Sequence, residues 1–176
     1  MNERALKAEL TMQIRPARFA DIPAIVAIIL EAYAHSIHAG SDVDVDVKVT
    51  KALLMQAIQR HGAKGAGGSS LFVAEHNGAV KGFIIGIVDR IQNIGTKLYA
   101  TDLMFLCAPD APPGAAGRLV TALVAWARSI PDVRMIYLGA SDVVGDWART
   151  EKLYRRKGFT QSGVTYRMEV NPCPAS

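Results

Sequence analysis

The stretch from Gly114 to Arg118 has the residue types of an anion-binding site. Four small residues, Gly-Ala-Ala-Gly, are followed directly by an arginine. They open a predicted helix, about Gly114 to Ser129, whose free N–H groups and positive dipole end suit a pyrophosphate. Small side chains let a phosphate approach the backbone. A Gly/Ala helix start packed tightly on a sheet explains the same residues, so this stretch alone leaves both interpretations open.

A second stretch near the C-terminus combines a tyrosine, three basic residues and a Gly-Phe pair. Leu153 to Phe159 has the sequence Leu-Tyr-Arg-Arg-Lys-Gly-Phe. It lies in a predicted helix, Trp147 to Lys157, which Gly158 would end as a C-cap. Basic residues at a helix C-terminus also stabilise the helix dipole, and a helical tyrosine is often a core residue.

The cysteines and histidines do not suggest a redox or metal centre. Cys107 and Cys173 form neither a disulfide framework nor a zinc pattern. Cys107 ends an apolar run, which favours a small buried hydrophobe over a nucleophile. The histidines have no third ligand at suitable spacing, so we predict no metal.

The elements that must position these residues follow from hydrophobic periodicity. Asp21 should cap the first helix and Thr50 the second, and Asn77-Gly78 should join two strands in a hairpin. The predicted order is strand 13–18, helices from 22 and 50, strands 71–75, 82–90 and 98–108, helix 114–129, strand 135–138, helix 147–157 and strand 164–170. This order implies an α/β (α+β) domain with a mixed sheet and helices packed on it.

Together, the two stretches resemble the GNAT superfamily of acyl-CoA N-acyltransferases. The family opens the helix after its fourth strand with Arg/Gln-x-x-Gly-x-Gly/Ala, and Gly114-Ala115-Ala116 fits the last part. Its last helix often contains Leu-Tyr-x-x-x-Gly-Phe, which Leu153 to Phe159 matches. The resemblance covers about Gln13 to Val170. It implies a mostly antiparallel sheet flanked by helices on both faces.

The resemblance also implies an activity, namely direct attack of a primary amine on the thioester of acetyl-CoA in a ternary complex. Tyr154 would protonate the leaving thiolate. Asp102 would lie at the acceptor site, directly or through water, although a polar residue at a strand end explains it equally well. By strand alternation Asp102 should share a face with Met104 and Leu106. The implied cofactor-binding residues are Leu106, Cys107, Ala108, Gly114, Ala115, Ala116, Gly117, Arg118 and Trp147.

In the family, the acceptor site lies partly between the first two helices. Here that segment contains Tyr33, His35 and Ser36, followed by Asp42, Asp44 and Asp46. The three aspartates could attract a cationic amine. A solvated loop or strand edge is the favoured explanation for them. The acceptor itself, a small molecule or a protein amine, cannot be predicted.

Two departures from the family pattern motivate an alternative. The Arg/Gln position of the signature falls on Ala111, and the asparagine and alanine often found before the last-helix tyrosine fall on Trp147 and Thr150. The alternative is a catalytically inactive GNAT-like domain that binds acyl-CoA as a sensor or scaffold.

Length and composition limit the number of domains and the classes of protein to which the chain can belong. The 176 residues suit a single domain, residues 13–170, with a lead-in of residues 1–12 and a flexible tail of 171–176. The net charge of +4 is too small to argue for nucleic acid, and no Gly-x-Gly-x-x-Gly supports a Rossmann domain. No apolar run is long enough to span a membrane, so we expect a cytoplasmic protein. Homodimers are common among relatives, and the resemblance leaves a homodimer open here.

Overall fold

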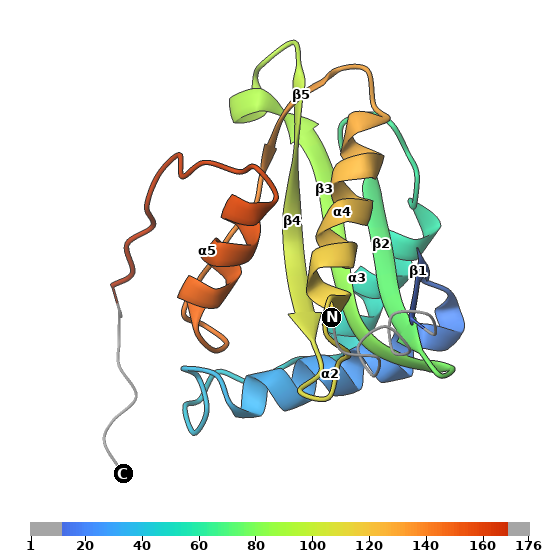
Figure 1. Ribbon diagram of the computed structural model, residues 1–176, viewed down its shortest axis with the longest axis vertical. Coiled ribbons are helices and arrows are strands. Elements are labelled where there is room, and N and C mark those ends of the chain that lie inside the picture. The colour runs from blue at the N-terminus through green and yellow to red at the C-terminus, as the bar shows by residue number, and fades with distance from the viewer. Residues whose placement is uncertain (1–11, 169–176) are drawn as a thin grey trace.

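A computed structural model describes residues 12–168, which form one five-stranded sheet (Figure 1). The strands are β1 (Met12–Pro16), β2 (Ser69–His76), β3 (Ala79–Arg90), β4 (Leu98–Cys107) and β5 (Val133–Tyr137), in that spatial order. Neighbours from β1 to β4 are antiparallel, whereas β4 and β5 are parallel. The predicted mixed, mostly antiparallel sheet is therefore confirmed.

Helices cover both faces of the sheet, as predicted. One face packs against α2 (Ile22–Ala34) and α3 (Val47–Gln59), with Ile25, Leu54 and Phe83 in its core. The other packs against α4 (Ala115–Arg128) and α5 (Trp147–Arg156), with Ile84 and Leu119 in its core. Phe83 and Ile84 are adjacent on β3, so their side chains point to opposite faces of the sheet and each packs into a different core. Short 3-10 turns, η1 (Phe19–Asp21) and η2 (Ile91–Asn93), precede α2 and follow β3.

Local sequence signals explain how several elements start and turn. Asn77 and Gly78 both have positive φ, 51° and 77°, as a type I′ hairpin turn requires, so the predicted hairpin is confirmed. The predicted cap of α3 is wrong. Asp46, not Thr50, caps this helix, because its Oδ1 accepts the N–H groups of Lys48 and Val49.

Asp21 precedes α2 as predicted but does not cap it with its side chain. Its carboxylate instead accepts two hydrogen bonds from the Arg15 guanidinium, at 2.7 and 2.8 Å, and one from the Arg18 N–H. Arg15 also contacts Glu75 of β2. This charge network joins β1, β2 and the start of α2 at the edge of the sheet.

The predicted last strand is wrong for the residues that the structure describes. Residues 164–168 form no strand, while Glu169 and Val170 lie outside the described residues. The predicted tail, 171–176, and nearly all of the lead-in, 1–12, lie outside them too. Within 12–168, no helix is long and apolar enough to cross a membrane.

Candidate active site

Strand β4 contains a β-bulge at Leu103. Ile85 of β3 pairs with Met104, whereas the next residue of β3, Gly86, pairs with Asp102. Leu103 is therefore an extra residue between two pairs, and its side chain is 47% exposed. A bulge reverses the alternation of inward and outward side chains in the strand beyond it.

The bulge corrects the predicted orientation of Asp102. An unbroken strand would place Asp102 on the same face as Met104 and Leu106, but these two residues pack with the core under α2 and α3. Gly86, directly opposite Asp102, faces Leu123 of α4. Asp102 therefore lies on the face covered by α4 and α5.

Beyond the bulge, β4 and β5 separate. They pair only where Leu98–Thr101 meets Val133–Tyr137, and among residues 12–168 no strand continues along β4 from Asp102 to Cys107 on that side. Met104 to Ala108 are only half-buried, although β4 lies inside the sheet. The second half of β4 thus has an open edge facing α5 (Figure 1).

Hydrogen bonding to β3 decides which backbone groups reach this edge. The N–H of Ala108 donates to the carbonyl of Lys81 at 2.9 Å, so Ala108 faces β3. In an antiparallel pair, successive residues direct their backbone N–H and C=O groups to opposite sides of the strand. The backbone groups of Leu106 therefore also point toward β3, whereas those of Phe105 and Cys107 point to the open edge. Of the three residues expected to contact a pantetheine arm, Cys107 alone presents its backbone there. Sequence reasoning missed Phe105 because hydropathy does not show which residues of a strand direct their backbone N–H and C=O groups to a given side.

Asp102 and Tyr154 meet at Gly139, which follows β5. Asp102 Oδ1 accepts the Gly139 N–H at 2.9 Å, and the Tyr154 hydroxyl donates to the Gly139 carbonyl at 3.1 Å. Tyr154 projects from α5 and is 6% exposed. The two predicted catalytic side chains are thus brought together from different elements. Sequence reasoning missed Gly139, because a single glycine after a strand indicates no more than a turn.

Burial shifts the proton affinity of both groups upward. Desolvation raises the pKa of Asp102, although the Gly139 N–H opposes this by stabilising the carboxylate. Desolvation, and secondly the charge of Asp102, raises the pKa of Tyr154 above its usual range. Asp102 therefore holds a proton more tightly than an exposed aspartate, and Tyr154 is protonated at neutral pH.

The open edge leads to the N-terminus of α4. Gly114 has a φ of 90°, a conformation that suits glycine. Among the described residues, Ala115 N–H has an acceptor in Pro112 and Arg118 N–H in Gly114. The N–H groups of Ala116 and Gly117, two half-exposed residues, have none. This turn thus offers free donors to an anion.

Two basic residues flank this turn. Lys157, after α5, donates to the Thr121 hydroxyl at 2.7 Å, and a Cβ on Gly117 would lie 4.0 Å from its Nζ. Arg118 lines a hollow with Met12 and Gln13, which places it on the β1 side of α4. Lys157 was not predicted as a site residue, because a basic helix end has the ordinary dipole explanation.

Cys107 lies at the open edge, close enough to the first turn of α5 for the charge of Arg149 to act on its thiol. Burial raises the pKa of the Cys107 thiol to about 11, and the charge of Arg149 acts in the opposite direction. The thiol therefore remains protonated at neutral pH and is a poor nucleophile. Trp147 is 50% exposed at the start of α5, and within the described residues its ring pairs with no other aromatic ring.

The segment predicted to bind the acceptor lies against the loop after β5. Ile37 N–H donates to the Val143 carbonyl at 3.1 Å. Within this segment, Ser36 is buried and its Oγ accepts the His38 N–H, while the Tyr33 ring stacks on His38 at 5.6 Å. His35 is exposed and bonds through Nδ1 to Glu31 of its own helix. The structure records no hydrogen bond from these residues to Asp102 or Tyr154.

Metal ligands do not gather in the described part of the chain. Between residues 12 and 168, no group of three or more His, Cys, Asp or Glu side chains is arranged to hold a metal ion.

Comparison with known proteins gives matches in structure but not in sequence. No family model and no curated protein matches the chain. An aminoglycoside N-acetyltransferase, AAC(6′)-Iy in complex with CoA, superposes with a TM-score of 0.66 at 14% identity, covering 91% of this chain and 95% of the other. Glucosamine-6-phosphate N-acetyltransferase from Arabidopsis thaliana has a TM-score of 0.64 at 10% identity, covering 92% and 99%.

A third solved structure is similar over the same length. The ribosomal-protein-alanine N-acetyltransferase from Brucella melitensis biovar Abortus 2308 has a TM-score of 0.64 at 17% identity, covering 91% of this chain and 99% of the other. At such low identity these likenesses establish the fold alone.

Proposed function

We propose that this chain, which has the GNAT fold, is an N-acetyltransferase that moves the acetyl group of acetyl-CoA to a primary amine. The observation that carries the proposal is the anchoring of Asp102 and Tyr154 on Gly139, at the edge that the β4 bulge leaves open. A half-buried carboxyl group and a buried phenol beside an open strand edge suit acyl transfer better than a structural role alone. The structural neighbours named above as N-acetyltransferases support the same class.

The open edge and the α4 N-terminus fit the two halves of a CoA molecule. The unpaired N–H and C=O groups of Phe105 and Cys107 would bond the amides of a pantetheine arm, much as a peptide adds to a sheet edge. The free N–H groups of Ala116 and Gly117 would hold the pyrophosphate. Lys157 would contribute a positive charge beside them.

Acetyl-CoA would supply an acyl thioester, in which the amine nitrogen forms a bond to the carbonyl carbon and the C–S bond breaks. Asp102 would take a proton from the amine, directly or through water. Its Oδ1 is occupied by Gly139, and its other oxygen has no hydrogen-bond partner among the described residues. Its raised pKa makes it a stronger base than an exposed aspartate.

Tyr154 would give its proton to the departing sulfur. Its hydroxyl now donates to Gly139, so the hydrogen must rotate about the phenolic C–O bond toward the thiolate. The raised pKa of Tyr154 does not prevent this transfer. The same burial that weakens the phenol as an acid also strengthens the thiolate as a base.

The second candidate function is acyl-CoA binding without transfer. Ala111 favours it, because it occupies the position of the family's Arg/Gln and packs against the core between α4 and the sheet. The alanine side chain cannot supply the phosphate contact that the family's Arg/Gln makes. Such a domain would bind CoA and leave Asp102 and Tyr154 in a structural network.

Turnover separates the two candidates. The experiment measures thiol release from acetyl-CoA with a panel of amines comprising a polyamine, an aminoglycoside, an amino-sugar phosphate and peptides with a free alanine N-terminus or a lysine. Amine-dependent release that is lost in Tyr154→Phe but retained in Tyr137→Phe supports transfer. CoA binding with no amine-dependent release across the panel supports the non-catalytic domain. We propose the cytoplasm, where acetyl-CoA is available, as the site of the activity.

A further inference from the structure

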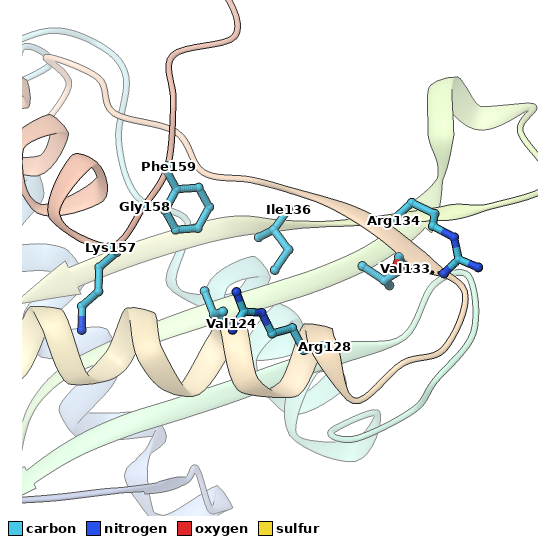
Figure 2. Close-up of a pocket in the computed structure, with 8 residues that line it drawn as sticks. All are labelled: Val124, Arg128, Val133, Arg134, Ile136, Lys157, Gly158 and Phe159. Atoms are coloured by element: carbon cyan, nitrogen blue, oxygen red, sulfur yellow. Dashed lines mark hydrogen bonds between the residues drawn. The ribbon is translucent and has the colours of Figure 1, made fainter.

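A cavity of about 310 Å³ lies between the C-terminal half of α4, strand β5 and the residues that follow α5 (Figure 2). Its apolar walls are formed by four half-buried side chains from these three parts of the chain: Val124, Val133, Ile136 and Phe159. The volume is at the lower end of the range of small-molecule sites, about 300 to 1,000 Å³. The cavity therefore has the size and the walls of a site for a small, largely apolar ligand.

The charged residues around this cavity are all basic. Arg128, Arg134 and Lys157 line it, whereas no acidic residue of the described chain does. Arg134 points away from the apolar walls in Figure 2, and its guanidinium donates to the Pro131 carbonyl at 2.6 Å. Lys157 donates to the neutral hydroxyl of Thr121. Neither contact cancels a charge, so the cavity favours an anionic ligand.

Arg128 is the cation that lies next to the apolar walls. Figure 2 shows its side chain running back along α4, with the guanidinium beside Val124, one helical turn earlier. Within residues 12–168, this guanidinium has no hydrogen-bond or ion-pair partner. The negative end of the helix dipole explains a cation in the last turn of α4. It does not explain why this cation lines an apolar cavity without a protein acceptor.

The cavity is separate from the turn proposed to hold a pyrophosphate. Ala116 and Gly117 lie in the first turn of α4, and Arg128 is its last residue. Arg128 follows Ala116 by twelve residues, about 18 Å along a helix that rises 1.5 Å per residue. Lys157 lines the cavity and also lies beside Gly117. A ligand anchored on Arg128 would therefore occupy a second site.

We propose that this cavity binds a small aromatic carboxylate, with the carboxylate on Arg128 and the ring against Ile136 and Phe159. A guanidinium can donate two parallel hydrogen bonds to a carboxylate, and such charge-assisted bonds are stronger than those between neutral groups. The Phe159 ring suits an aromatic ligand, because aromatic rings pack favourably edge to face or offset. Lys157 would add a second positive charge at the rim. This inference does not depend on the proposed activity.

Calorimetric titration of the full chain with 2-naphthoate and its neutral analogue 2-naphthamide tests the assignment. The two probes share one ring system, so a difference in affinity reports on the carboxylate. The wild type should bind one molecule of 2-naphthoate, about 10-fold more tightly than 2-naphthamide. Arg128→Gln should raise the Kd for 2-naphthoate by about 10-fold and leave the Kd for 2-naphthamide unchanged.

Arg156→Gln is the matched control. Arg156 carries the same charge in the last turn of α5, but it does not line the cavity, and its Nε donates to the Lys152 carbonyl. This variant should bind both probes as the wild type does. A second variant, Val124→Phe, should weaken both probes because the larger side chain fills the cavity. Melting temperatures of Arg128→Gln and Arg156→Gln that equal the wild type exclude loss of folding as the cause.

Amide NMR signals locate the bound probe. Addition of 2-naphthoate should shift the signals of Val124, Arg128 and Ile136 and leave those of Ala116 and Gly117 in place. Shifts at Ala116 and Gly117 instead would assign the anion to the start of α4 and overturn the proposal.

Three calorimetric results would also overturn it. Equal affinity for the two probes would mean that the carboxylate is not recognised. Equal losses in Arg128→Gln and Arg156→Gln would mean that Arg128 acts only through the overall charge. Failure of the wild type to bind either probe at millimolar concentration would mean that the cavity is covered in solution.

Discussion

Asp102 and Tyr154 bind opposite polar groups of one residue, the N–H and the C=O of Gly139. The aspartate comes from β4 and the tyrosine from α5, so a single backbone position fixes the spacing between the proposed base and the proposed acid. Gly139 follows the point where β5 leaves β4. The divergence of these two strands therefore creates both the open edge and the anchor for the groups beside it.

Removal of the Tyr154 hydroxyl should slow turnover. In Tyr154→Phe we expect kcat to fall about 100-fold or more with little change in KM, because a general acid acts in the transition state. The lost hydrogen bond to Gly139 should lower the free energy of unfolding by about 1 kcal/mol. Steady-state kinetics and thermal unfolding measure the two effects.

The matched control is Tyr137→Phe. Tyr137 is partly exposed, and its hydroxyl contacts only Met135 among the described residues. It should keep the wild-type kcat. Full turnover by Tyr154→Phe would remove Tyr154 from the chemistry and leave it a structural role.

Asp102→Asn should change the pH dependence of the reaction. Below its pKa, Asp102 is protonated and cannot accept a proton, so kcat/KM should fall as the pH decreases. Because burial raises this pKa, the fall should occur at a higher pH than an exposed aspartate would give. The asparagine variant should lose this fall in kcat/KM and keep the pH dependence that is due to the acceptor amine. An identical profile in both proteins would exclude Asp102 as the base.

The same substitution should stabilise the fold at neutral pH. A raised pKa means that the native state binds more protons than the unfolded state, so the free energy of unfolding falls as the pH rises through the interval between the unfolded and folded pKa values. The asparagine side chain would not have this dependence but could still accept the Gly139 N–H. We expect Asp102→Asn to unfold at a higher temperature than wild type at pH 7, and the difference to vanish at low pH. A variant less stable than wild type at pH 7 would contradict this.

Lys157→Gln should weaken CoA binding. Its ammonium lies beside Gly117 at the start of α4, so its loss should raise the Kd for CoA by roughly 3- to 10-fold, as expected for one charge-assisted contact near the surface. Arg155→Gln is the control, because Arg155 carries the same charge two residues earlier, in the last turn of α5, but pairs with Glu151. Calorimetric titration of both variants measures the difference. Equal losses would indicate a general effect of charge.

Periodicity and turn chemistry predicted most of the fold. The Asn77-Gly78 hairpin and the amphipathic helices α2, α4 and α5 follow from local sequence. The predicted strand at 164–170 shows the limit of these local signals. Alternation establishes that a segment can have one apolar face, but it does not determine which surface that face will pack against.

The site was predicted less completely than the fold. Tyr154 was found by its motif, and the structure brings it close to Asp102. The side of the sheet on which Asp102 lies was predicted wrongly. The run from Leu103 to Leu106 is apolar throughout, so its sequence gives no sign of the bulge at Leu103. Gly139 and Lys157 join the site through tertiary contacts that leave no signal in the local sequence.

A thermal-shift titration with acetyl-CoA, with free CoA and ATP as controls, tests the central claim most directly. At a ligand concentration 100 times the Kd, binding adds about 2.7 kcal/mol to the free energy of unfolding, which should raise the melting temperature by about 5 to 10 °C. The account predicts this shift with both CoA species and little shift with ATP, which lacks the pantetheine arm that the open edge of β4 would bind. No shift with either CoA species at millimolar concentration would contradict it.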